Sequence, residues 1–348
     1  MKFKHGLVLG KFYPPHKGHL YLIEEAKKRC DLLTVVISSL KAEQIPGSLR
    51  FEWLKALTKG KDVNIVWIQD ENPQYPEEDP NFWNIWKQSI QEALYKSQSS
   101  PIDSIFSSEL YGDPLGNVLG VPHELIDLGR KNFSISASQI RNEPSKYWDF
   151  IPELLRPYFL KRVVITGPES VGKSTLTRML GEAFQTSIVE EYAREYLESK
   201  GRYVIEEDIL QIGKGHLKLE LEMSKHANRI LFLDTDHITT KIYSEYYFKN
   251  CPKWIEFCAK NLQYDESIFL DIDVPWIADP QRDLGEVREE IKSIFQLELK
   301  KAKRSYKLVS GSFLQRAEVA KSIIEMILKQ PMNPIYFTEE QRNLRTLE

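Results

Sequence analysis

Residues 162–176 read RVVITGPESVGKSTL, and this stretch carries the most informative pattern in the chain. A short apolar run stops at Gly167, the pattern G-x-x-x-x-G-K-S follows, and an apolar-periodic segment comes after it. Gly167 and Gly172 permit backbone conformations that turn successive N–H groups toward a phosphate, and a helix start adds partial positive charge. Lys173 suits the outer phosphates of a nucleotide, and the hydroxyl of Ser174 suits Mg²⁺.

This stretch therefore predicts a strand, a phosphate-binding loop and a helix in succession. A chance turn with a solvent-facing lysine is the alternative, and the agreement of the loop with both of its flanks argues against it. Besides Lys173, the predicted loop comprises Gly167, Pro168, Glu169, Ser170, Val171, Gly172, Ser174 and Thr175.

The composition is that of an ordinary globular protein. Its 348 residues exceed the ~150 that one domain usually holds, so two domains are expected. A net charge of −3 gives no indication of broad binding to nucleic acid. No apolar run approaches the ~18 residues of a membrane span, and the opening MKFKHGLVLGKF does not form a signal peptide. Cys30, Cys251 and Cys258 lack C-x-x-C spacing, which fits free thiols in a reducing cytoplasm.

A second phosphate-binding pattern follows the apolar residues 6–9, where residues 10–20 read GKFYPPHKGHL. The two prolines hold the chain extended, and His16, Gly18 and His19 open a segment with helical periodicity. His16 and His19 would share one face of the helix start, where backbone N–H groups and the helix dipole favour an anion. Two imidazoles there suit a triphosphate and its leaving oxygen, although surface histidines or half of a metal site are alternatives.

The rest of the first half fits a parallel sheet with crossover helices. Residues 32–38, 63–68 and 103–106 are expected strands, and residues 48–57 and 81–95 are expected helices. The aromatic side chains of residues 81–95 are expected in the core rather than in a binding site, because they recur at helical spacing.

Residues 134–141, SISASQIR, form the last chemical element of this half. Ser136, Ser138 and Arg141 place two hydroxyls and a guanidinium in one turn, as a second phosphate cradle requires. Serines that simply cap a helix are the alternative.

In the second half, residues 229–236 read RILFLDTD, an apolar run that ends in two carboxylates. Asp234 and Asp236 beside a phosphate loop suit Mg²⁺ or an acceptor hydroxyl, and the alternative is that they cap the following helix. Residues 274–285 form an expected loop in which Arg282 closes over transferring phosphates or, alternatively, is solvated.

The order of these motifs resembles the NadR-type bifunctional nicotinamide mononucleotide (NMN) adenylyltransferases and ribosylnicotinamide kinases. Residues 10–19 match the Gly-x-Phe-x-Pro-x-His-x-Gly-His signature of nucleotidyltransferases, with Ser138 in place of the usual threonine in the second element. The resemblance covers residues 5–327 and also rests on SSELYGD, the connector RNEPSKYWDFIPELLRP, GPESVGKS, EEYAREY, LDTDHITT and DPQRDLG.

This resemblance implies two doubly wound α/β domains. Residues 1–158 would form a Rossmann-like nucleotidyltransferase domain, residues 159–330 a P-loop kinase domain and residues 331–348 a tail. ATP in the first domain would meet Gly10, Lys11, Phe12, Gly18, Ser136 and Ser138, with His16, His19 and Arg141 as catalytic residues. NMN would lie near Ser107, Ser108, Glu109, Tyr111 and Gly112. In the second domain the riboside would meet Glu191, Tyr192 and Arg194, a metal would bind Ser174 and Asp234, and the catalytic residues would be Lys173, Asp234, Asp236 and Arg282.

The implied activity is NAD salvage in two steps, with Mg²⁺ and one ATP for each step. The kinase domain would phosphorylate nicotinamide riboside to NMN, and the first domain would adenylylate NMN to NAD with release of pyrophosphate. A different small phosphate ester as substrate, or a nucleotide-sensing regulator without turnover, are the alternatives. Some members carry an N-terminal helix-turn-helix, whereas this sequence begins on its first strand, so DNA-binding regulation is not expected. The oligomeric state is left open.

Overall fold

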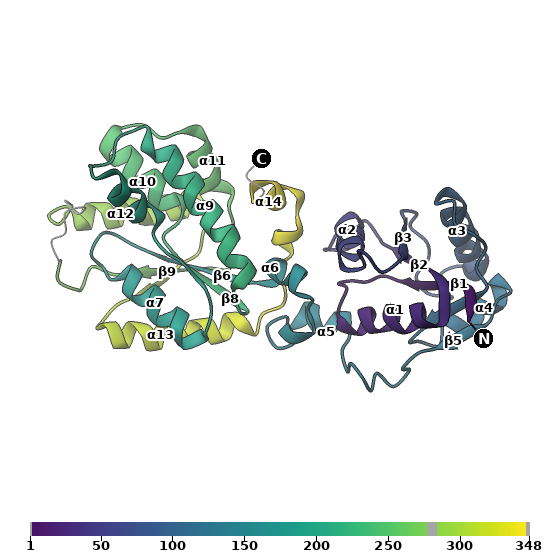
Figure 1. The fold of residues 1–348 in the computed structure, drawn as a ribbon. Coiled ribbons are helices and arrows are strands. Elements are labelled where there is room, and N and C mark those ends of the chain that lie inside the picture. The colour runs from purple at the N-terminus through teal and green to yellow at the C-terminus, as the bar shows by residue number, and fades with distance from the viewer. Residues whose placement is uncertain (1, 277–283, 346–348) are drawn as a thin grey trace. The chain divides into compact units, whose positions relative to one another are not determined.

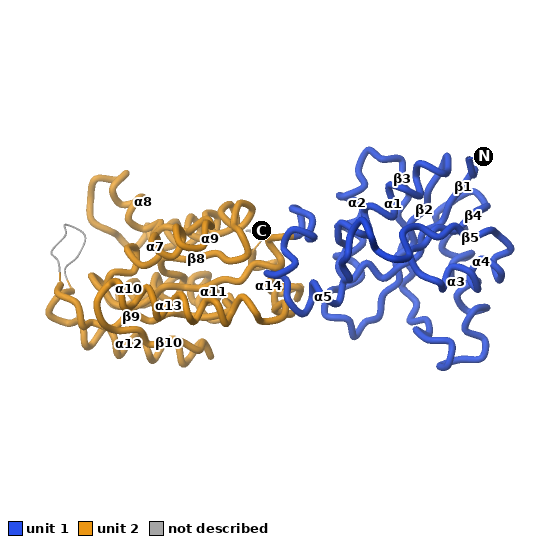
Figure 2. Tube along the Cα trace, turned by 90° about the horizontal axis from the view of Figure 1, so that it is seen from below, with its two compact units in different colours: residues 1–155 blue, residues 156–348 orange. Residues whose placement is uncertain are grey.

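The computed structural model describes residues 2–276 and 284–345. The chain divides into two compact units, Met1–Leu155 and Arg156–Glu348, coloured blue and orange in Figure 2. Each unit contains its own five-stranded parallel sheet, which confirms the predicted fold class of two α/β units.

The sheet of the first unit has the strand order β3-β2-β1-β4-β5. Its strands are β1 (Phe3–Gly10), β2 (Cys30–Ser38), β3 (Val63–Ile68), β4 (Ser104–Ser107) and β5 (His123–Leu125). The chain order reverses at β1, which pairs with β2 on one side and with β4 on the other. The crevice beyond the carboxyl end of such a strand is the usual place for a ligand.

Helices cover both faces of this sheet (Figure 1). They are α1 (Lys17–Arg29), α2 (Gly47–Leu57), α3 (Phe82–Lys96), α4 (Gly112–Leu119) and α5 (Ala137–Asn142). Successive strand residues point to opposite faces, so Val8 packs with α1 and α2 whereas Leu7 packs with α3 and α4. The periodic segments of the sequence therefore become the two layers that enclose the sheet.

The sheet of the second unit has the order β10-β9-β6-β8-β7. Its strands are β6 (Lys161–Thr166), β7 (Ile188–Val189), β8 (Ile230–Asp234), β9 (Glu266–Leu270) and β10 (Lys307–Val309). The central strand β6 pairs with β8 and β9, so this sheet also reverses at the strand that precedes the phosphate-binding loop.

The helices of the second unit pack on both faces of its sheet. One face packs against α7 (Lys173–Phe184) and α13 (Phe313–Leu328), and another core cluster includes α10 (His237–Phe248) and α12 (Arg288–Lys301). The remaining helices are α6 (Arg156–Phe159), α8 (Tyr192–Lys200), α9 (Asp208–His226), α11 (Lys253–Asn261) and α14 (Glu339–Leu344). None of the helices among residues 2–276 and 284–345 is long and apolar enough to cross a membrane.

The segment after residue 330, which the sequence set apart as a tail, packs within the second unit. Tyr336 and Phe337 of the 3₁₀ helix Pro334–Phe337 are buried. The guanidinium of Arg345 lies 5.3 Å from the ring centroid of Tyr336 and 5.7 Å from that of Tyr264, and its Nε lies 3.4 Å from Glu220 Oε1. These few anchors stand between polar residues without periodicity, so no sequence pattern indicates this packing.

Candidate functional site

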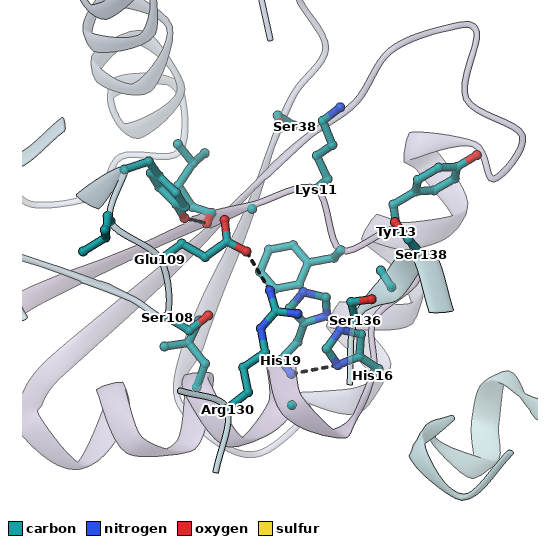
Figure 3. A pocket seen from close by; sticks show the side chains of 18 of the residues that line it. Lys11, Tyr13, His16, His19, Ser38, Ser108, Glu109, Arg130, Ser136 and Ser138 are labelled. Atoms are coloured by element: carbon teal, nitrogen blue, oxygen red, sulfur yellow. Dashed lines mark hydrogen bonds and ion pairs between the residues drawn. The ribbon is translucent and has the colours of Figure 1, made fainter. Parts of the chain in front are cut away.

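The first unit has a cavity of about 1030 Å³ beyond the carboxyl ends of β1 and β4. It collects residues from β1, the start of α1, the turn after β4 and the start of α5 (Figure 3). Of the residues predicted for this site, those that line the cavity are Gly10, Lys11, Phe12, His16, Gly18, His19, Ser108, Glu109, Tyr111, Ser136, Ser138 and Arg141.

Both histidines stand at the start of α1, as the sequence predicts. His16 is the N-cap residue, and its Nδ1 accepts from the backbone N–H of His19 at 3.3 Å. The two rings stack with centroids 3.7 Å apart. Burial, with a smaller contribution from Arg130, lowers the pKa of His19 to about 3, and burial with the neighbouring His19 and Arg130 also holds the pKa of His16 far below its ordinary value. Both rings that face the cavity are therefore neutral.

The cradle at α5 is held by Tyr13. Arg141 donates to Ser138 Oγ at 3.0 Å and to the Tyr13 carbonyl, and its guanidinium lies 4.1 Å from the Tyr13 ring centroid. Ser136 caps α5 by accepting from the N–H of Gln139, so the capping alternative also holds for this serine. Ser136 also lines the cavity, so the same residue caps α5 and faces the site.

A buried ion pair that the sequence did not reveal supports the loop after β1. Arg50 is fully buried, donates to the Lys11 carbonyl at 2.8 Å and pairs with Glu43 at 2.5 Å. Glu43 lies also 3.3 Å from Lys11 Nζ. Arg50 stands inside an ordinary helical pattern, and its partners come from elsewhere in the chain, so no local signal marks it.

Aromatic side chains of α3 form part of the cavity wall. Phe82 and Trp86 are buried in the core, which confirms the prediction for these two residues. Together with Trp83 they also line the cavity, which the sequence analysis did not foresee. Helical spacing shows which residues face inward, but it does not show that this face reaches a cavity.

The turn after β4 contributes three of the five residues predicted there. Ser108, Glu109 and Tyr111 line the cavity, and Arg130 donates to Glu109 at 3.0 Å. Tyr111 donates its hydroxyl to the Leu9 carbonyl, and burial raises its pKa. The predicted residues Ser107 and Gly112 are not among the lining residues, and both instead contact His123.

In the second unit, β6, the glycine-rich loop and α7 follow one another as predicted. Gly167 has φ 137° and Gly172 has φ 89°, conformations that L side chains rarely adopt. A β-carbon at Gly167 would lie 2.8 Å from the Leu270 carbonyl oxygen. Lys173 begins α7 and donates to the carbonyls of Gly167 at 3.1 Å and Pro168 at 2.8 Å. The lysine is therefore held across the loop.

A second cavity of about 970 Å³ adjoins this loop. The predicted residues that line it are Glu169, Ser170, Gly172, Lys173, Ser174, Thr175, Glu191 and Arg194. Thr235, Thr239 and Thr240 of the LDTDHITT motif also line it, as do Tyr243 and Tyr247, which no motif marked. Gly167, Pro168, Val171 and Tyr192 do not line the cavity: the first two accept from Lys173, Val171 is in the core, and Tyr192 packs on Gly215.

Asp234 ends β8 in a buried position beside the phosphate loop. Burial and the nearby carboxylate of Glu191 raise its pKa to about 6, against the lowering effects of Lys173 and Ser174. Among the described residues, no hydrogen-bond partner reaches its Oδ1. An unpartnered carboxylate oxygen near a loop serine fits Mg²⁺, whose other ligands are usually nucleotide phosphates and water. No group of three or more acidic, histidine or cysteine side chains within the described ranges could hold a metal without them.

Asp236 has a different role from the one predicted. It caps α10, where its Oδ1 accepts from the N–H groups of Ile238 at 3.1 Å and Thr239 at 3.3 Å. Its Oδ2 lies 2.9 Å from Arg304 Nη1, and its carboxylate is buried. Neither Asp234 nor Asp236 is among the residues that line the cavity. The capping alternative therefore holds for Asp236, and a catalytic role for this residue stays a prediction. Arg282, the other predicted catalytic residue on a loop, lies outside the described residues.

The fold and the two cavities define a fused pair of nucleotide-binding α/β units, the second of them with a P-loop. Residues 162–316 match the AAA domain family. The chain is 33% identical over 297 residues to the trifunctional NAD biosynthesis/regulator protein NadR of Escherichia coli K12, a match that covers 80% of this chain and 72% of that protein. The NadR of Salmonella typhimurium is 31% identical over 299 residues, with the same coverage. The chain belongs to the NadR family.

A solved structure shows the same fold over nearly the whole chain. The crystal structure of a NadR protein in complex with NR superposes with a TM-score of 0.80 at 23% sequence identity, and the match covers 95% of this chain and 98% of that one. A NadR structure in complex with NAD and AMP-PNP matches with a TM-score of 0.78.

Proposed function

We propose that the protein makes NAD from nicotinamide riboside in two steps, each at one of the two cavities. The second unit phosphorylates the riboside to NMN with ATP, and the first unit joins NMN to the adenylyl group of another ATP. The observation that carries this proposal is the presence, in one NadR-family chain, of two separate cavities that each open at the start of a helix. Each helix start offers N–H groups and positive dipole charge to a polyphosphate.

In the kinase step, the chain's own residues bind and align the reactants. Lys173 would leave the loop carbonyls and neutralise the γ-phosphate, while Glu191 and Arg194 hold the riboside. Ser174 and Asp234 would hold Mg²⁺, which when bound neutralises charge on the β- and γ-phosphates. Because Asp236 is engaged as a helix cap, we assign the role beside the acceptor hydroxyl to Asp234.

In the adenylyl transfer step, the phosphate of NMN would attack the α-phosphate of ATP and release pyrophosphate. A phosphate dianion is already a nucleophile, so no covalent intermediate with the protein is needed. His16, His19 and Arg141 would bind the triphosphate and stabilise the charge that develops on it, with Ser136 and Ser138 as further donors. Catalysis would come from alignment and charge stabilisation rather than from an ionised base.

The cellular compartment and the class of partner molecules that we propose follow from the amino-acid composition. Three free, buried cysteines suit a reducing compartment, so we place the protein in the cytoplasm. With a net charge of −3, small molecules rather than nucleic acid are the expected partners.

Incubation of the full chain with nicotinamide riboside and Mg-ATP tests the proposal, with NMN and NAD followed by mass spectrometry. We expect both compounds to appear, NMN before NAD. NMN without NAD would contradict the assignment of the first unit, and the absence of both compounds would contradict the whole function. Other phosphate esters offered with ATP would show whether NMN is the preferred acceptor.

A further inference from the structure

Three side chains outside the lining of the first cavity contact one another in series, with His123 of the edge strand β5 in the middle. The side chain of His123 is 4% exposed. Its Nδ1 lies 2.8 Å from Oδ1 of Asp113, which belongs to α4 and is largely exposed. Its Nε2 lies 2.8 Å from Oγ of Ser107, the last residue of β4. Asp113, His123 and Ser107 therefore connect the surface of α4 to the end of a central strand.

The first turns of α4 leave room for the ring of His123. A β-carbon at Gly112 would lie 2.2 Å from His123 Nε2, so any larger residue at position 112 would displace the ring. A β-carbon at Gly116 would lie 2.8 Å from the Val121 carbonyl oxygen and 3.5 Å from the His123 β-carbon. The placement of the His123 ring thus depends on Gly112, whereas Gly116 leaves room for the backbone that leads into β5.

Ser107 connects His123 to the turn after β4, whose residues line the cavity. Its hydroxyl donates to the Glu109 carbonyl at 2.6 Å and its Oγ accepts from the Glu109 N–H at 3.3 Å, which closes a serine turn. Ser108, Glu109 and Tyr111 of this turn line the cavity, although Ser107 does not. The hydroxyl orientation at Ser107 therefore sets the path of the backbone that presents these three residues.

The order of contacts is that of a hydrolytic Asp-His-Ser triad, but the surroundings exclude nucleophilic chemistry at Ser107. Ser107 is 1% exposed, and its hydroxyl is already engaged by the main chain of Glu109. A nucleophile needs a substrate atom within reach, and the Ser107 side chain is outside the cavity. The three residues consequently act on the shape of the site rather than on the reacting atoms.

We propose that His123, oriented by Asp113, is a positioning residue that shapes the mononucleotide side of the first cavity through the Ser107 hydroxyl. The inference rests on the proposed adenylyl transfer. Loss of the His123–Ser107 contact would leave the turn free to move, so the affinity for NMN would fall while the ATP-binding residues on α1 and α5 keep their places.

Two substitutions at one position separate positioning from simple packing. The side-chain amide of His123→Asn can take the place of Nδ1 and keep Asp113, but it does not reach Ser107. The longer amide of His123→Gln can take the place of Nε2 and keep Ser107. We expect His123→Asn to raise KM for NMN about tenfold, the effect of one lost hydrogen bond, with kcat and KM for ATP within about twofold. His123→Gln should stay within about threefold of the unchanged protein in KM for NMN.

Kinase activity and thermal unfolding of the same full-length variants are the controls. Kinase turnover should be unchanged in both, since the second unit has its own core. If His123→Asn does not fold, Ser107→Ala removes the same contact from the other side and should raise KM for NMN at least as much, because it also removes the Ser107 bonds to Glu109. Where His123→Asn does fold, the double variant His123→Asn/Ser107→Ala should be no worse than Ser107→Ala alone, because Ser107→Ala already removes the contact with His123.

Equal KM values for NMN in His123→Asn and His123→Gln, whether raised or unchanged, would overturn the positioning role. Calorimetric titration with NMN distinguishes this result from failure of the proposed function. Absence of NMN binding by the unchanged protein would overturn the function and this inference together. Normal NMN binding by the unchanged protein, with equal binding by the two variants, would overturn the inference alone.

Discussion

Asp234 and Asp236 stand two residues apart, but their carboxylates have different contacts. Asp236 caps α10 through Oδ1 and forms an ion pair with Arg304 through Oδ2, whereas Oδ1 of Asp234 has neither contact among the described residues. In an extended strand end the two side chains would share a face, but the cap forces Asp236 into the helix start. The ion pair with Arg304, a residue distant in sequence, also holds the Asp236 carboxylate, and no local pattern reveals this contact.

Substitution of each aspartate by asparagine tests the difference. We expect Asp234→Asn to lower kinase kcat by about 10²–10⁴-fold, the range for loss of a group that acts on the reacting atoms. Asparagine is as good a cap as aspartate, so Asp236→Asn should keep its catalytic rate when folded. It should nevertheless lower the unfolding free energy of the second unit by about 3–5 kcal/mol, because Arg304 is left buried without its partner. An equal fall in kcat in both variants would restore Asp236 as a catalytic candidate.

The pKa of Asp234 predicts a pH dependence for the kinase. With a pKa raised to about 6, this carboxyl is protonated below that pH and then cannot ligate Mg²⁺. We expect kcat/KM for the riboside to fall as the pH drops through about 6, and the midpoint to move lower when Mg²⁺ is raised. Adenylyl transfer measured in parallel should not show a midpoint near pH 6. The pKa values of His16 and His19 are lowered, so both rings stay neutral through this pH range. A midpoint that does not change with the Mg²⁺ concentration would show that this titration is not linked to metal binding.

At the scale of elements, the sequence predicted those parts whose pattern is local. Spacing alone indicates the local geometry of the loop glycines before α7 and of the histidines at the start of α1. Both motifs lie where they were expected. The edge strand β5 was missed because it has three residues, two of them polar, and it gains its place by pairing with β4.

The helix α9 was missed for a related reason. Its buried face includes His216, Glu220 and Ser224, polar residues that a helical pattern places on the solvent side. Glu220 is nevertheless satisfied by Tyr264 at 3.0 Å and by Arg162 at 3.3 Å, and both partners come from other elements. Contacts of this kind between distant elements shape the second unit around its cavity, and a local sequence pattern does not reveal them.

Gly167→Ala tests the geometry of the phosphate-binding loop. Position 167 has φ 137°, and an added β-carbon would lie 2.8 Å from the Leu270 carbonyl, so the loop must shift. A shift of about 1 Å in such a loop should lower kinase kcat/KM by on the order of 10²-fold. Assays of both activities in the same variant provide the check, because adenylyl transfer should be retained. Kinase activity near that of the unchanged protein would show that this loop does not position the phosphates.

At the scale of the molecule, each unit has its own sheet and core, and the C-terminal segment belongs to the second. A chain ending at Gln330 would lose the buried side chains of Met332, Tyr336 and Phe337. At about 1.5–3 kcal/mol for each of these three large side chains, the unfolding free energy of the second unit should fall by at least about 4.5 kcal/mol. Calorimetric melting should show a lowered transition for the second unit with adenylyl transfer intact. An unchanged melting profile would contradict the packing of this segment.

If two independent sites act in succession on the riboside and then on its product, two variants that are each inactive at one site should complement each other when mixed. Given nicotinamide riboside and Mg-ATP, His19→Ala should accumulate NMN, with NAD synthesis reduced on the order of 10²–10³-fold. Lys173→Ala should make no NMN but should convert added NMN to NAD. Mixed together, the two variants should form NAD from the riboside. The account would be contradicted if either single substitution abolished both reactions, or if the mixture failed to produce NAD.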